Sequence, residues 1–200
     1  KVVFASSFAM FAAVRACEQI RNSVCYPKLN VKVAATHSGI TVGEDGASHQ
    51  CIEDVSIMRA LPGMAVVCPC DAVETRMAIK AAIEYDGPMY IRLGRLAVDD
   101  VYEAEGYTYE FGKGITIKDG TDVTIVAAGL MVQESIKAVE ILAENGISAR
   151  LIDMHTIKPI DKDILVKAAK ETGLIVTVEE HTIVGGLGSA VCEALAENYP

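Results

Sequence analysis

The sequence lacks several features that would place it in a common functional class. No stretch of it approaches the roughly 20 consecutive apolar residues that a membrane-spanning helix requires. Positive charge is scarce, because 18 lysines and arginines stand against 27 acidic residues in 200, for a net charge of −9. This balance disfavours binding to nucleic acid or to an anionic membrane. We therefore expect a globular protein with neither partner, in which a small anionic substrate needs local positive charge.

Its cysteines also lack the spacing of metal or redox sites. None of the six is part of a paired metal-type spacing, and Cys68-Pro69-Cys70 is not the CxxC redox motif. We expect buried thiols in a reducing compartment, and no metal ligands. The first residues, KVVFASSFAMFAA, begin as a signal peptide does, but they continue as an amphipathic segment without a convincing cleavage site. The expected location is the cytoplasm.

What the sequence does contain is a regular alternation of short β-rich apolar runs and longer segments of helical periodicity, which predicts parallel βα units. In the first half we expect strands at residues 2–5, 31–36, 65–68 and 88–93, with helices beginning near Ser7, Ile52 and Ala72. The third helix has the clearest start, because Asp71 and Glu74 have the spacing of a capping box. Asp86-Gly87-Pro88 ends it near Tyr85.

A change in composition separates this series from a second one. From residue 97 to 122 the chain is acidic and glycine-containing, with short alternation only in YTYEF and GITI, which predicts a linker with a hairpin. Strands are then expected at 123–127, 148–153 and 174–178, with helices at 132–144, at 161–170 and from Gly188 onward. We predict two consecutive α/β domains with mainly parallel sheets, at residues 1–97 and 122–200, joined by a linker at 98–121.

Polar residues gather where two of the predicted strands end. The run VKVAAT leads directly into His37, and MYIRLG leads directly into Arg95. Ligands of open parallel sheets bind beyond the carboxyl ends of the strands, so both side chains are expected at one rim. The loop GEDGASHQ follows His37 by a few residues and brings Asp45 and His49 to the same rim, with glycines that allow positive φ.

These side chains suit a phosphorylated polyol. The guanidinium of Arg95 can bind a phosphate with two donors, and Asp45 can accept hydrogen bonds from hydroxyl groups. Either His37 or His49 can move protons near neutral pH. Spacing alone leaves an equal alternative, in which His37 and Arg95 are ordinary strand-end residues bound by solvent or local carboxylates. Glu44 is expected to be a solvated or capping acid.

Other features are expected to be structural. Phe8, Phe11 and Val14 have the helical spacing of a core stripe. The turn VGGLGSA, which begins at Val184, lacks the G-x-G-x-x-G spacing of a dinucleotide site, so we expect tight packing of a strand on a helix. His181, with Glu179 and Glu180, is expected to be solvated at a strand end, and a site at these residues is the alternative.

Several of these motifs, in this order, resemble those of transketolase, the thiamine-diphosphate enzyme. They are Thr36-His37-Ser38-Gly39-Ile40, the GEDGASHQ loop, Leu61-Pro62, Pro69, Asp71 and Arg92-Leu93-Gly94-Arg95. The resemblance covers essentially the whole chain. Residues 1–97 look like the pyrimidine-binding domain of transketolases, and the second α/β series looks like their C-terminal domain.

The resemblance implies roles for the rim residues. His49 is similar to the active-site histidine that contacts the substrate near the reacting centre and assists proton transfer. Asp45 is similar to the carboxylate that recognises a sugar hydroxyl, and His37 and Arg95 to the residues that hold the sugar phosphate. The implied reaction transfers a two-carbon ketol unit from a ketose phosphate to an aldose phosphate, as in the pentose phosphate pathway. Thiamine diphosphate supplies the electron sink.

The resemblance also implies cofactor contacts and a missing part. Phe11 is similar to the aromatic that packs on the aminopyrimidine ring, and Phe8 lines the same pocket, whereas Val14 stands where some transketolases have a further aromatic. The cofactor-activating glutamate and the domain that binds diphosphate and Mg²⁺ do not occur in this sequence. We expect either a fragment or part of a subunit whose partner chain holds that domain, inactive by itself. The expected assembly is a homodimer.

Three alternatives stay open. Deoxyxylulose-phosphate synthase is a related thiamine enzyme with the same domain order and a similar histidine loop, although the GEDG run favours transketolase. The chain could instead be a dimerisation module that does not bind the cofactor. A dinucleotide-binding protein that uses the GGLGSA turn is the third alternative.

Overall fold

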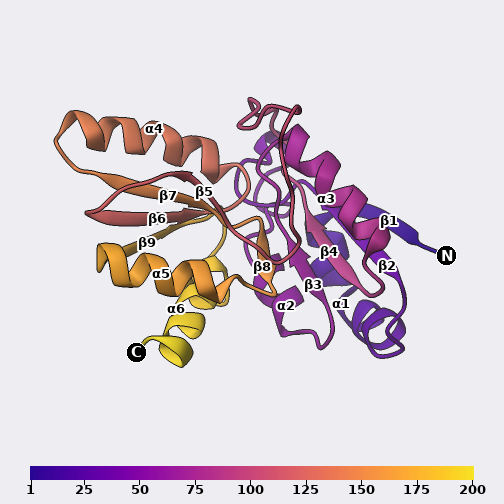
Figure 1. Cartoon of the computed structure of the whole chain (residues 1–200). Helices are drawn as coiled ribbons and strands as arrows, with labels where there is room; N and C mark the ends of the chain where they lie inside the picture. Colours follow the sequence, from indigo (N-terminus) through magenta and orange to yellow (C-terminus); the bar gives the residue numbers. More distant parts are fainter.

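The computed structural model describes residues 1–200 and consists of two α/β lobes that lie side by side (Figure 1). The first lobe contains a five-stranded sheet of order β1-β2-β4-β3-β8, and the second a four-stranded sheet of order β5-β7-β6-β9. The strands are β1 (Val3–Phe8), β2 (Val31–Thr36), β3 (Ala65–Val67), β4 (Met89–Arg92), β5 (Ile115–Lys118), β6 (Val123–Ala127), β7 (Ala149–Asp153), β8 (Thr156–Lys158) and β9 (Ile175–Val178).

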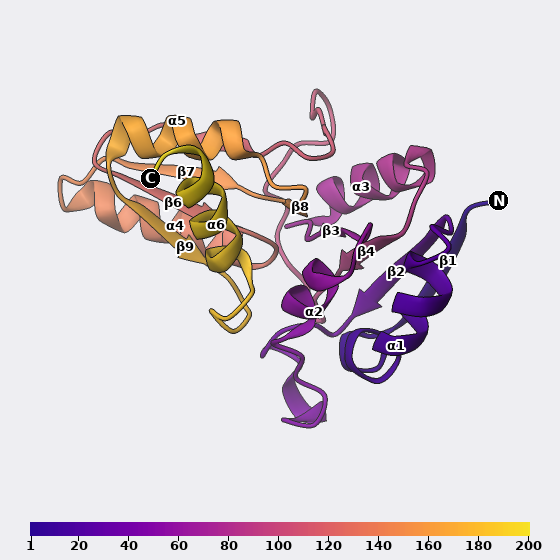
Figure 2. The same ribbon diagram turned by 90° about the horizontal axis from the view of Figure 1, so that it is seen from below.

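Helices cover both faces of each sheet (Figures 1 and 2). In the first lobe, α3 covers one face of the sheet, and α1 and α2 cover the opposite face. In the second lobe, α4 covers one face, and α5 and α6 cover the opposite face. The helical segments are η1 (Met10–Arg15), α1 (Cys17–Ile20), η2 (Arg21–Cys25), η3 (Gly43–Asp45), α2 (Asp54–Ala60), α3 (Ala72–Glu84), α4 (Met131–Glu144), α5 (Lys162–Thr172) and α6 (Leu187–Asn198). Of these, η1 and η2 are π-helical turns, and η3 is a single 3₁₀ turn.

The strand pairing confirms two α/β domains with mainly parallel sheets. β1, β2, β4 and β3 run parallel to one another, as do β7, β6 and β9. The two antiparallel pairs are β3 with β8 and β5 with β7, each at the edge of its sheet. Helical crossovers between parallel strands place the carboxyl ends of those strands at a common edge.

The expected hairpin in the linker is not present. The segment YTYEF forms no strand, and GITI contributes β5, which pairs with β7 rather than with a neighbour in sequence. Its alternating burial is that of an edge strand with one covered face, a pattern that a hairpin strand shares. β8 comes from the second half of the chain but joins the first sheet. The boundaries 1–97 and 122–200 therefore stay a proposal.

Two differences from the sequence-based expectations concern helix starts. β1 continues through Phe8, and the helical segment begins only at Met10. The helix α3 begins as predicted, with the carboxylate of Asp71 accepting the backbone N–H of Glu74 at 2.6 Å. The side chain of Glu74, however, accepts the N–H of Cys70 at 2.7 Å instead of reaching the cap residue, so the capping box is only half formed.

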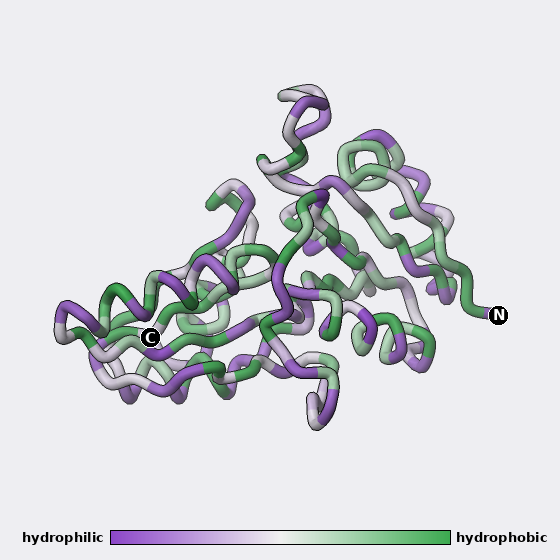
Figure 3. Tube along the Cα trace, turned by 90° about the horizontal axis from the view of Figure 1, so that it is seen from above, coloured by the Kyte–Doolittle hydropathy of each residue, from purple (hydrophilic) through white to green (hydrophobic).

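One hydrophobic cluster runs through both lobes, from Val33 and Tyr90 in the first sheet to Ile152 and Leu187 in the second domain. Burial of this kind is the main favourable term in folding, so the two domains share one source of stability. The edge strand β1 is different, because Val3 keeps 50% of its surface exposed, and Figure 3 shows the apolar colour extending toward the N-terminus. No helix has the length and apolar character needed to cross a bilayer.

The cysteines form no disulfide. Four of them are buried as expected, namely Cys25, Cys51, Cys68 and Cys70, whereas Cys192 on α6 is exposed. Burial raises the pKa of Cys51 and of Cys68 to about 12. These two thiols are therefore protonated and unreactive near neutral pH.

Candidate active site

The carboxyl ends of β2 and β4 meet at one edge of the first sheet. The strands are adjacent and parallel, with Ala35 opposite Arg92, and the pairing continues one residue further as Leu93 N–H donates to the carbonyl of Ala35 at 2.8 Å. His37 directly follows β2, and Arg95 lies three residues beyond the end of β4. The structure thus brings both residues to the rim predicted from the sequence.

The backbone at His37 turns sharply as it leaves the strand. His37 has φ of +58°, a left-handed conformation that costs about 1–2 kcal/mol for a residue with a side chain. The next residue holds the turn, because both the N–H and the hydroxyl of Ser38 donate to the carbonyl of Leu93, at 3.2 and 2.9 Å. The turn places the imidazole of His37 flat on the ring of Phe8, with centroids 3.8 Å apart.

The GEDGASHQ residues form a loop that projects from the first lobe at the lower edge of Figure 2. Its base is closed by a bridge in which Gly39 N–H donates to the carbonyl of Cys51 at 2.8 Å. After the turn η3, Gly46 adopts φ of +71°, and its carbonyl accepts the N–H of His49 at 3.0 Å. A glycine permits this left-handed conformation at no steric cost, which explains its place before the histidine.

His49 packs with its edge toward two aromatic rings. Its ring centroid lies 6.0 Å from that of Phe8 and 5.3 Å from that of Phe11, at interplanar angles of 75° and 78°. Its Nδ1 lies 2.9 Å from the hydroxyl of Ser48, and Nε2 makes no hydrogen bond within the chain. His49 is half-buried, so a ligand can reach it.

Arg95, which follows β4, forms a second group with Glu44 and Asp45 of this loop. The guanidinium of Arg95 pairs with Glu44 at 2.5 Å, and its Nε lies 3.8 Å from a carboxylate oxygen of Asp45. Glu44 keeps 79% of its side chain exposed, in agreement with the expectation of a solvated acid. Asp45 and His49 are four residues apart, so the loop links the Arg95 group to the His37 and His49 group.

The two phenylalanines are rim residues rather than a core stripe. Both are half-buried, and Val14 is exposed, whereas the neighbouring Ala12 and Ala13 face the core. The rings of Phe8 and Phe11 are nearly parallel, with centroids 5.9 Å apart. The expectation of a helical core stripe was wrong because Phe8 ends a strand and Phe11 lies in a π-helical turn, so a period of 3.6 residues does not apply.

This arrangement suits one part of thiamine diphosphate. Parallel, partly exposed aromatic rings beside a histidine can pack on a planar pyrimidine. No group of three metal donors lies at this rim, because the only such group in the chain consists of Cys70, Glu74 and Asp153, away from the loop. The residues present therefore fit the aminopyrimidine ring and not a magnesium diphosphate.

The group of Cys70, Glu74 and Asp153 was not anticipated from the sequence. One donor atom from each residue lies within 4.8 Å of the others, and all three residues are buried. Glu74 accepts the hydroxyl of Tyr107 at 2.6 Å, and Asp153 accepts that of Tyr102 at 2.8 Å. The second oxygen of Asp153 has no hydrogen-bond partner. Glu74 and Asp153 come from different domains, so this cluster lies at the seam between them.

Burial favours the protonated forms of the acidic groups in this cluster. Burial raises the pKa of Glu74, and burial together with the negative charge of Glu74 raises the pKa of Asp153 well above the ordinary range. Burial and the negative charges of Asp153 and Glu74 also raise the pKa of the Cys70 thiol, so this thiol is protonated near neutral pH. We interpret Glu74 and Asp153 as a protonated carboxyl pair. No spacing rule could have found it, because its members are far apart in sequence.

A second buried network joins the domains near the rim. Arg92 pairs with Asp54 at 2.9 Å, and the hydroxyl of Tyr90 donates to the same carboxylate oxygen at 2.8 Å. Arg92 also donates to the backbone carbonyl of Glu180 at 2.8 Å. The side chain of His181 is 1% exposed and lies 3.8 Å from Asp54. The expectation that His181 and Glu180 are solvated was wrong, because the end of β9 is covered by the first domain.

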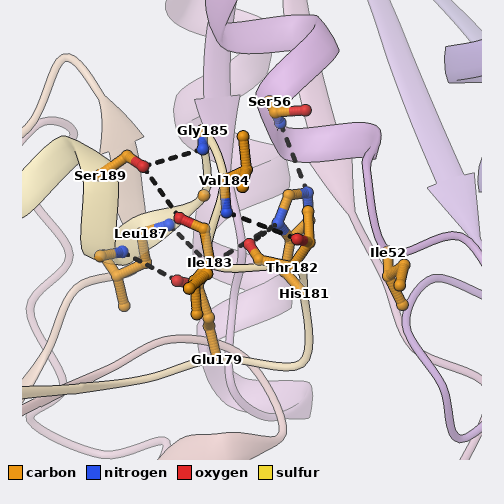
Figure 4. Close-up of polar contacts among 12 residues, drawn as sticks. Ile52, Ser56, Glu179, His181, Thr182, Ile183, Val184, Gly185, Leu187 and Ser189 are labelled. Atoms are coloured by element: carbon orange, nitrogen blue, oxygen red, sulfur yellow. Dashed lines mark hydrogen bonds and ion pairs between the residues drawn. The ribbon is translucent and has the colours of Figure 1, made fainter.

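The turn after β9 packs as the sequence predicted (Figure 4). The carboxylate of Glu179 accepts the N–H groups of Leu187 and Gly188, at 2.6 and 2.8 Å, and so caps α6. A side chain at Gly185 would collide with Ser56 on α2. The glycines thus allow close packing, and the place where a dinucleotide fold would bind a pyrophosphate is filled by Glu179.

Family comparisons agree with the two-domain architecture. The model of the transketolase pyrimidine-binding domain matches residues 1–100, and that of the transketolase C-terminal domain matches residues 112–200. A putative transketolase C-terminal section from Methanocaldococcus jannaschii is 56% identical over 99% of this chain. A subunit of the apulose-4-phosphate transketolase from Phocaeicola vulgatus is 45% identical over 99%, and a 1-deoxy-D-xylulose-5-phosphate synthase from Heliobacterium modesticaldum is 38% identical over 90%.

Solved structures show the same similarity. A split-gene transketolase described as an inactive β4 tetramer superposes on all of this chain with a TM-score of 0.93 and 54% identity. A Pichia stipitis transketolase in complex with sedoheptulose 7-phosphate gives 0.78 over 91% of the chain at 29% identity. The chain spans 62%, 64% and 28% of the three relatives' lengths, and 64% and 27% of the two solved chains.

Proposed function

The chain belongs to the transketolase family, and we therefore propose that it is the part of a thiamine-dependent transketolase that binds the aminopyrimidine ring and the sugar phosphates. The proposed reaction transfers a two-carbon ketol unit from a ketose phosphate to an aldose phosphate. One observation carries the proposal: His49 lies against both Phe8 and Phe11, on the loop whose other end meets Arg95.

Thiamine diphosphate, when bound, supplies the electron sink for the two-carbon unit. In this chain Phe11 and Phe8 would hold the aminopyrimidine ring by stacking, and they would exclude water from it. The rim has no cluster of three metal donors, so we assign the magnesium and diphosphate contacts to another polypeptide or domain. This division of labour is consistent with relatives that are named as a C-terminal section and as one subunit of a transketolase.

The sugar phosphate is assigned to Arg95, His37 and Asp45. Arg95 presents several N–H donors to a phosphate, and its present partner Glu44 is an exposed carboxylate that the phosphate can replace. His37 is fixed by its stacking on Phe8 and can donate a further hydrogen bond to the phosphate. Asp45 accepts a hydrogen bond from a sugar hydroxyl.

His49 is assigned the proton transfer at the substrate. The hydroxyl of Ser48 holds Nδ1, which leaves Nε2 available to take or give a proton. The aromatic rings of Phe8 and Phe11 pack edge-on against the imidazole, and this packing supports the defined position that a general acid or base requires. We further propose that the complete enzyme is a dimer located in the cytoplasm.

The test is a two-carbon transfer assay on this chain combined with the polypeptide that holds the diphosphate domain. Fructose 6-phosphate and sedoheptulose 7-phosphate serve as donors. We expect His49→Ala to lower kcat by about 10²–10⁴-fold, and Ser48→Ala to lower it much less. Undiminished transfer by the His49 variant would remove this histidine from the proposed role.

Calorimetry on the chain alone tests the division of the cofactor site. We expect weak or undetectable binding of thiamine diphosphate with Mg²⁺, because the chain contacts only one part of the cofactor. Sub-micromolar affinity would contradict the assignment of the diphosphate to another polypeptide. No binding by the combined polypeptides would favour a dimerisation module without a cofactor.

A second candidate function comes from the similarity to 1-deoxy-D-xylulose-5-phosphate synthase, at 38% identity. The two functions differ in their product, so product analysis of the combined polypeptides distinguishes them. Formation of 1-deoxy-D-xylulose 5-phosphate without ketol transfer would replace our proposal. The higher identity to a transketolase section, 56%, supports transketolase.

A further inference from the structure

Two neighbouring carboxylates at the end of β9 point to different domains. Glu179 accepts N–H groups of Leu187 and Gly188, so it serves the helix that follows it in its own domain (Figure 4). Glu180 is 7% exposed, and its Oε1 accepts the backbone N–H of Thr41 in the first domain at 2.6 Å. Adjacent residues of one type therefore have different structural tasks.

The contact of Glu180 lies at the base of the candidate site loop. Thr41 is four residues after His37 and four residues before Asp45. The backbone beside it is pressed against the carboxylate, because a Cβ at Gly39 would overlap the carboxyl group of Glu180. Gly39 also has φ of +83°, so a glycine is required there for two reasons.

Glu180 is itself held in place. Its backbone carbonyl accepts a hydrogen bond from Arg92 at 2.8 Å, and Arg92 is fixed by its buried ion pair with Asp54. Two residues further on, Thr182 N–H donates to the carbonyl of Ile52 at 2.8 Å. The carboxylate of Glu180 is thus presented to Thr41 from a rigid frame, which is what a positioning group requires.

We infer that Glu180 is a positioning residue through which the C-terminal domain holds the loop that carries Asp45 and His49. The inference rests on the proposed function of that loop. A hydrogen bond from a backbone N–H to a carboxylate is stronger than one between two neutral groups, so this contact holds the base of the loop tightly. Glu180 and Thr41 also line a cavity of about 510 Å³ between the domains. Without the carboxylate, the Thr41 N–H faces this cavity instead of a protein acceptor.

The contact can be tested without catalysis, by amide hydrogen exchange on the full chain. In Glu180→Ala we expect the Thr41 amide to exchange at least about tenfold faster, since it loses a charged acceptor. Glu179→Ala is the matched control, and it should speed exchange at Leu187 and Gly188 but not at Thr41. Unchanged exchange at Thr41 in the Glu180 variant would overturn the inference.

The consequence for the site is tested with the combined polypeptides and fructose 6-phosphate. In Glu180→Ala we expect KM to rise about tenfold and kcat to fall less than about threefold, since a displaced loop weakens binding most. Glu180→Gln should restore most of the affinity, because its amide oxygen can accept the Thr41 N–H. Equal KM values for the Ala and Gln variants would overturn the inference, because the acceptor would then have no role.

Failure of this inference can be distinguished from failure of the proposed function. If His49→Ala is inactive while Glu180→Ala binds substrate as the parent does, only the role of Glu180 is refuted. If the parent itself shows no ketol transfer, the proposed function fails. The exchange of the Thr41 amide then still decides whether Glu180 holds the loop.

Discussion

Arg92 and Arg95 lie three residues apart in the segment RLGR, yet they belong to opposite kinds of environment. Arg92 ends β4 inside the seam between the domains, where it forms an ion pair with Asp54. The Arg92 side chain is 6% exposed and that of Asp54 is 0% exposed. Arg95 lies past the strand at the open rim, where it forms an ion pair with Glu44. The Arg95 side chain is 31% exposed and that of Glu44 is 79% exposed. The same residue type thus forms a fixed contact in one region and an exchangeable contact in the other.

This contrast indicates which of the two regions can bind a ligand. A buried ion pair that loses one member leaves an uncompensated charge, so the seam cannot release Arg92 to a substrate. An exposed pair contributes little and is screened by solvent, so a phosphate can displace Glu44 from Arg95. We therefore expect stability to depend on the seam and ligand binding to depend on the rim.

The largest expected effect comes from breaking the buried pair. Arg92→Met should lower the free energy of unfolding by about 3–5 kcal/mol, because the charge of Asp54 stays buried without its cation. The matched variant Arg95→Met should change it by less than about 0.5 kcal/mol. Urea denaturation followed by circular dichroism measures both. Similar losses for the two variants would contradict the distinction between seam and rim.

The reverse ranking is expected for substrate affinity. Arg95→Met should raise KM for a phosphorylated sugar by about tenfold to a hundredfold, since a charge-assisted bond is worth about 1.5–3 kcal/mol. The same sugar without its phosphate is the control, and its transfer should be equally poor in parent and variant. A variant that is impaired equally with both sugars would show that Arg95 does not read the phosphate.

The carboxyl pair of Glu74 and Asp153 makes the seam sensitive to pH. Both folded-state pKa values are raised, so the stabilisation that this pair contributes is fully present below the unfolded pKa values, near 4, and is lost as pH rises through the folded-state values. Asp153→Asn removes one proton site and can donate to Glu74 through its amide.

The free energy of unfolding should fall between roughly pH 5 and pH 9 in both proteins. In Asp153→Asn we expect this decrease to be about 1–2 kcal/mol smaller than in the parent. Thermal unfolding across that range measures it. Asp163→Asn, at a carboxylate that is 77% exposed, is the control and should follow the parent. A parallel decline in Asp153→Asn and the parent would show that the pair does not hold a proton.

The smallest effect is expected at Glu44. Glu44→Gln removes the exposed partner that a phosphate must displace, so KM for the sugar phosphate should fall by about two- to threefold. Stability should not change measurably. Steady-state kinetics at low ionic strength gives the clearest result, because salt screens exposed charges. A higher KM would show that Glu44 holds Arg95 in its binding position.

Much of the site followed from local patterns. An apolar strand that runs into a histidine or an arginine places that residue at a sheet edge, which is why the rim position of His37 and Arg95 could be predicted. The start of α3 was recognised because Asp71 has the spacing and chemistry of a cap. Phe8 was misplaced on a helix, since an apolar residue at the end of a strand looks the same in sequence as one that begins a helix.

The contacts between domains could not be predicted in the same way. Glu180 and Thr41 are 139 positions apart, and the charged residues EEH after a strand are typical of a solvated end. Asp153 ends the strand β7 and gave no sign that Glu74 would lie beside it. Which residues contact each other across the interface depends on how the two domain surfaces pack. A single sequence contains no periodic pattern that indicates this packing.

The two α/β series, the rim residues and the loop with its glycines follow from the order of neighbouring residues, so the chain's sequence alone was enough to predict them. Which charges are exposed and which are buried depends instead on how the domains pack. Packing made Arg92 structural and left Arg95 accessible, and it turned Glu180 toward the loop of the other domain. The energy of a charge depends on its distance from water and from other charges, and both distances are set only when the two domains come together.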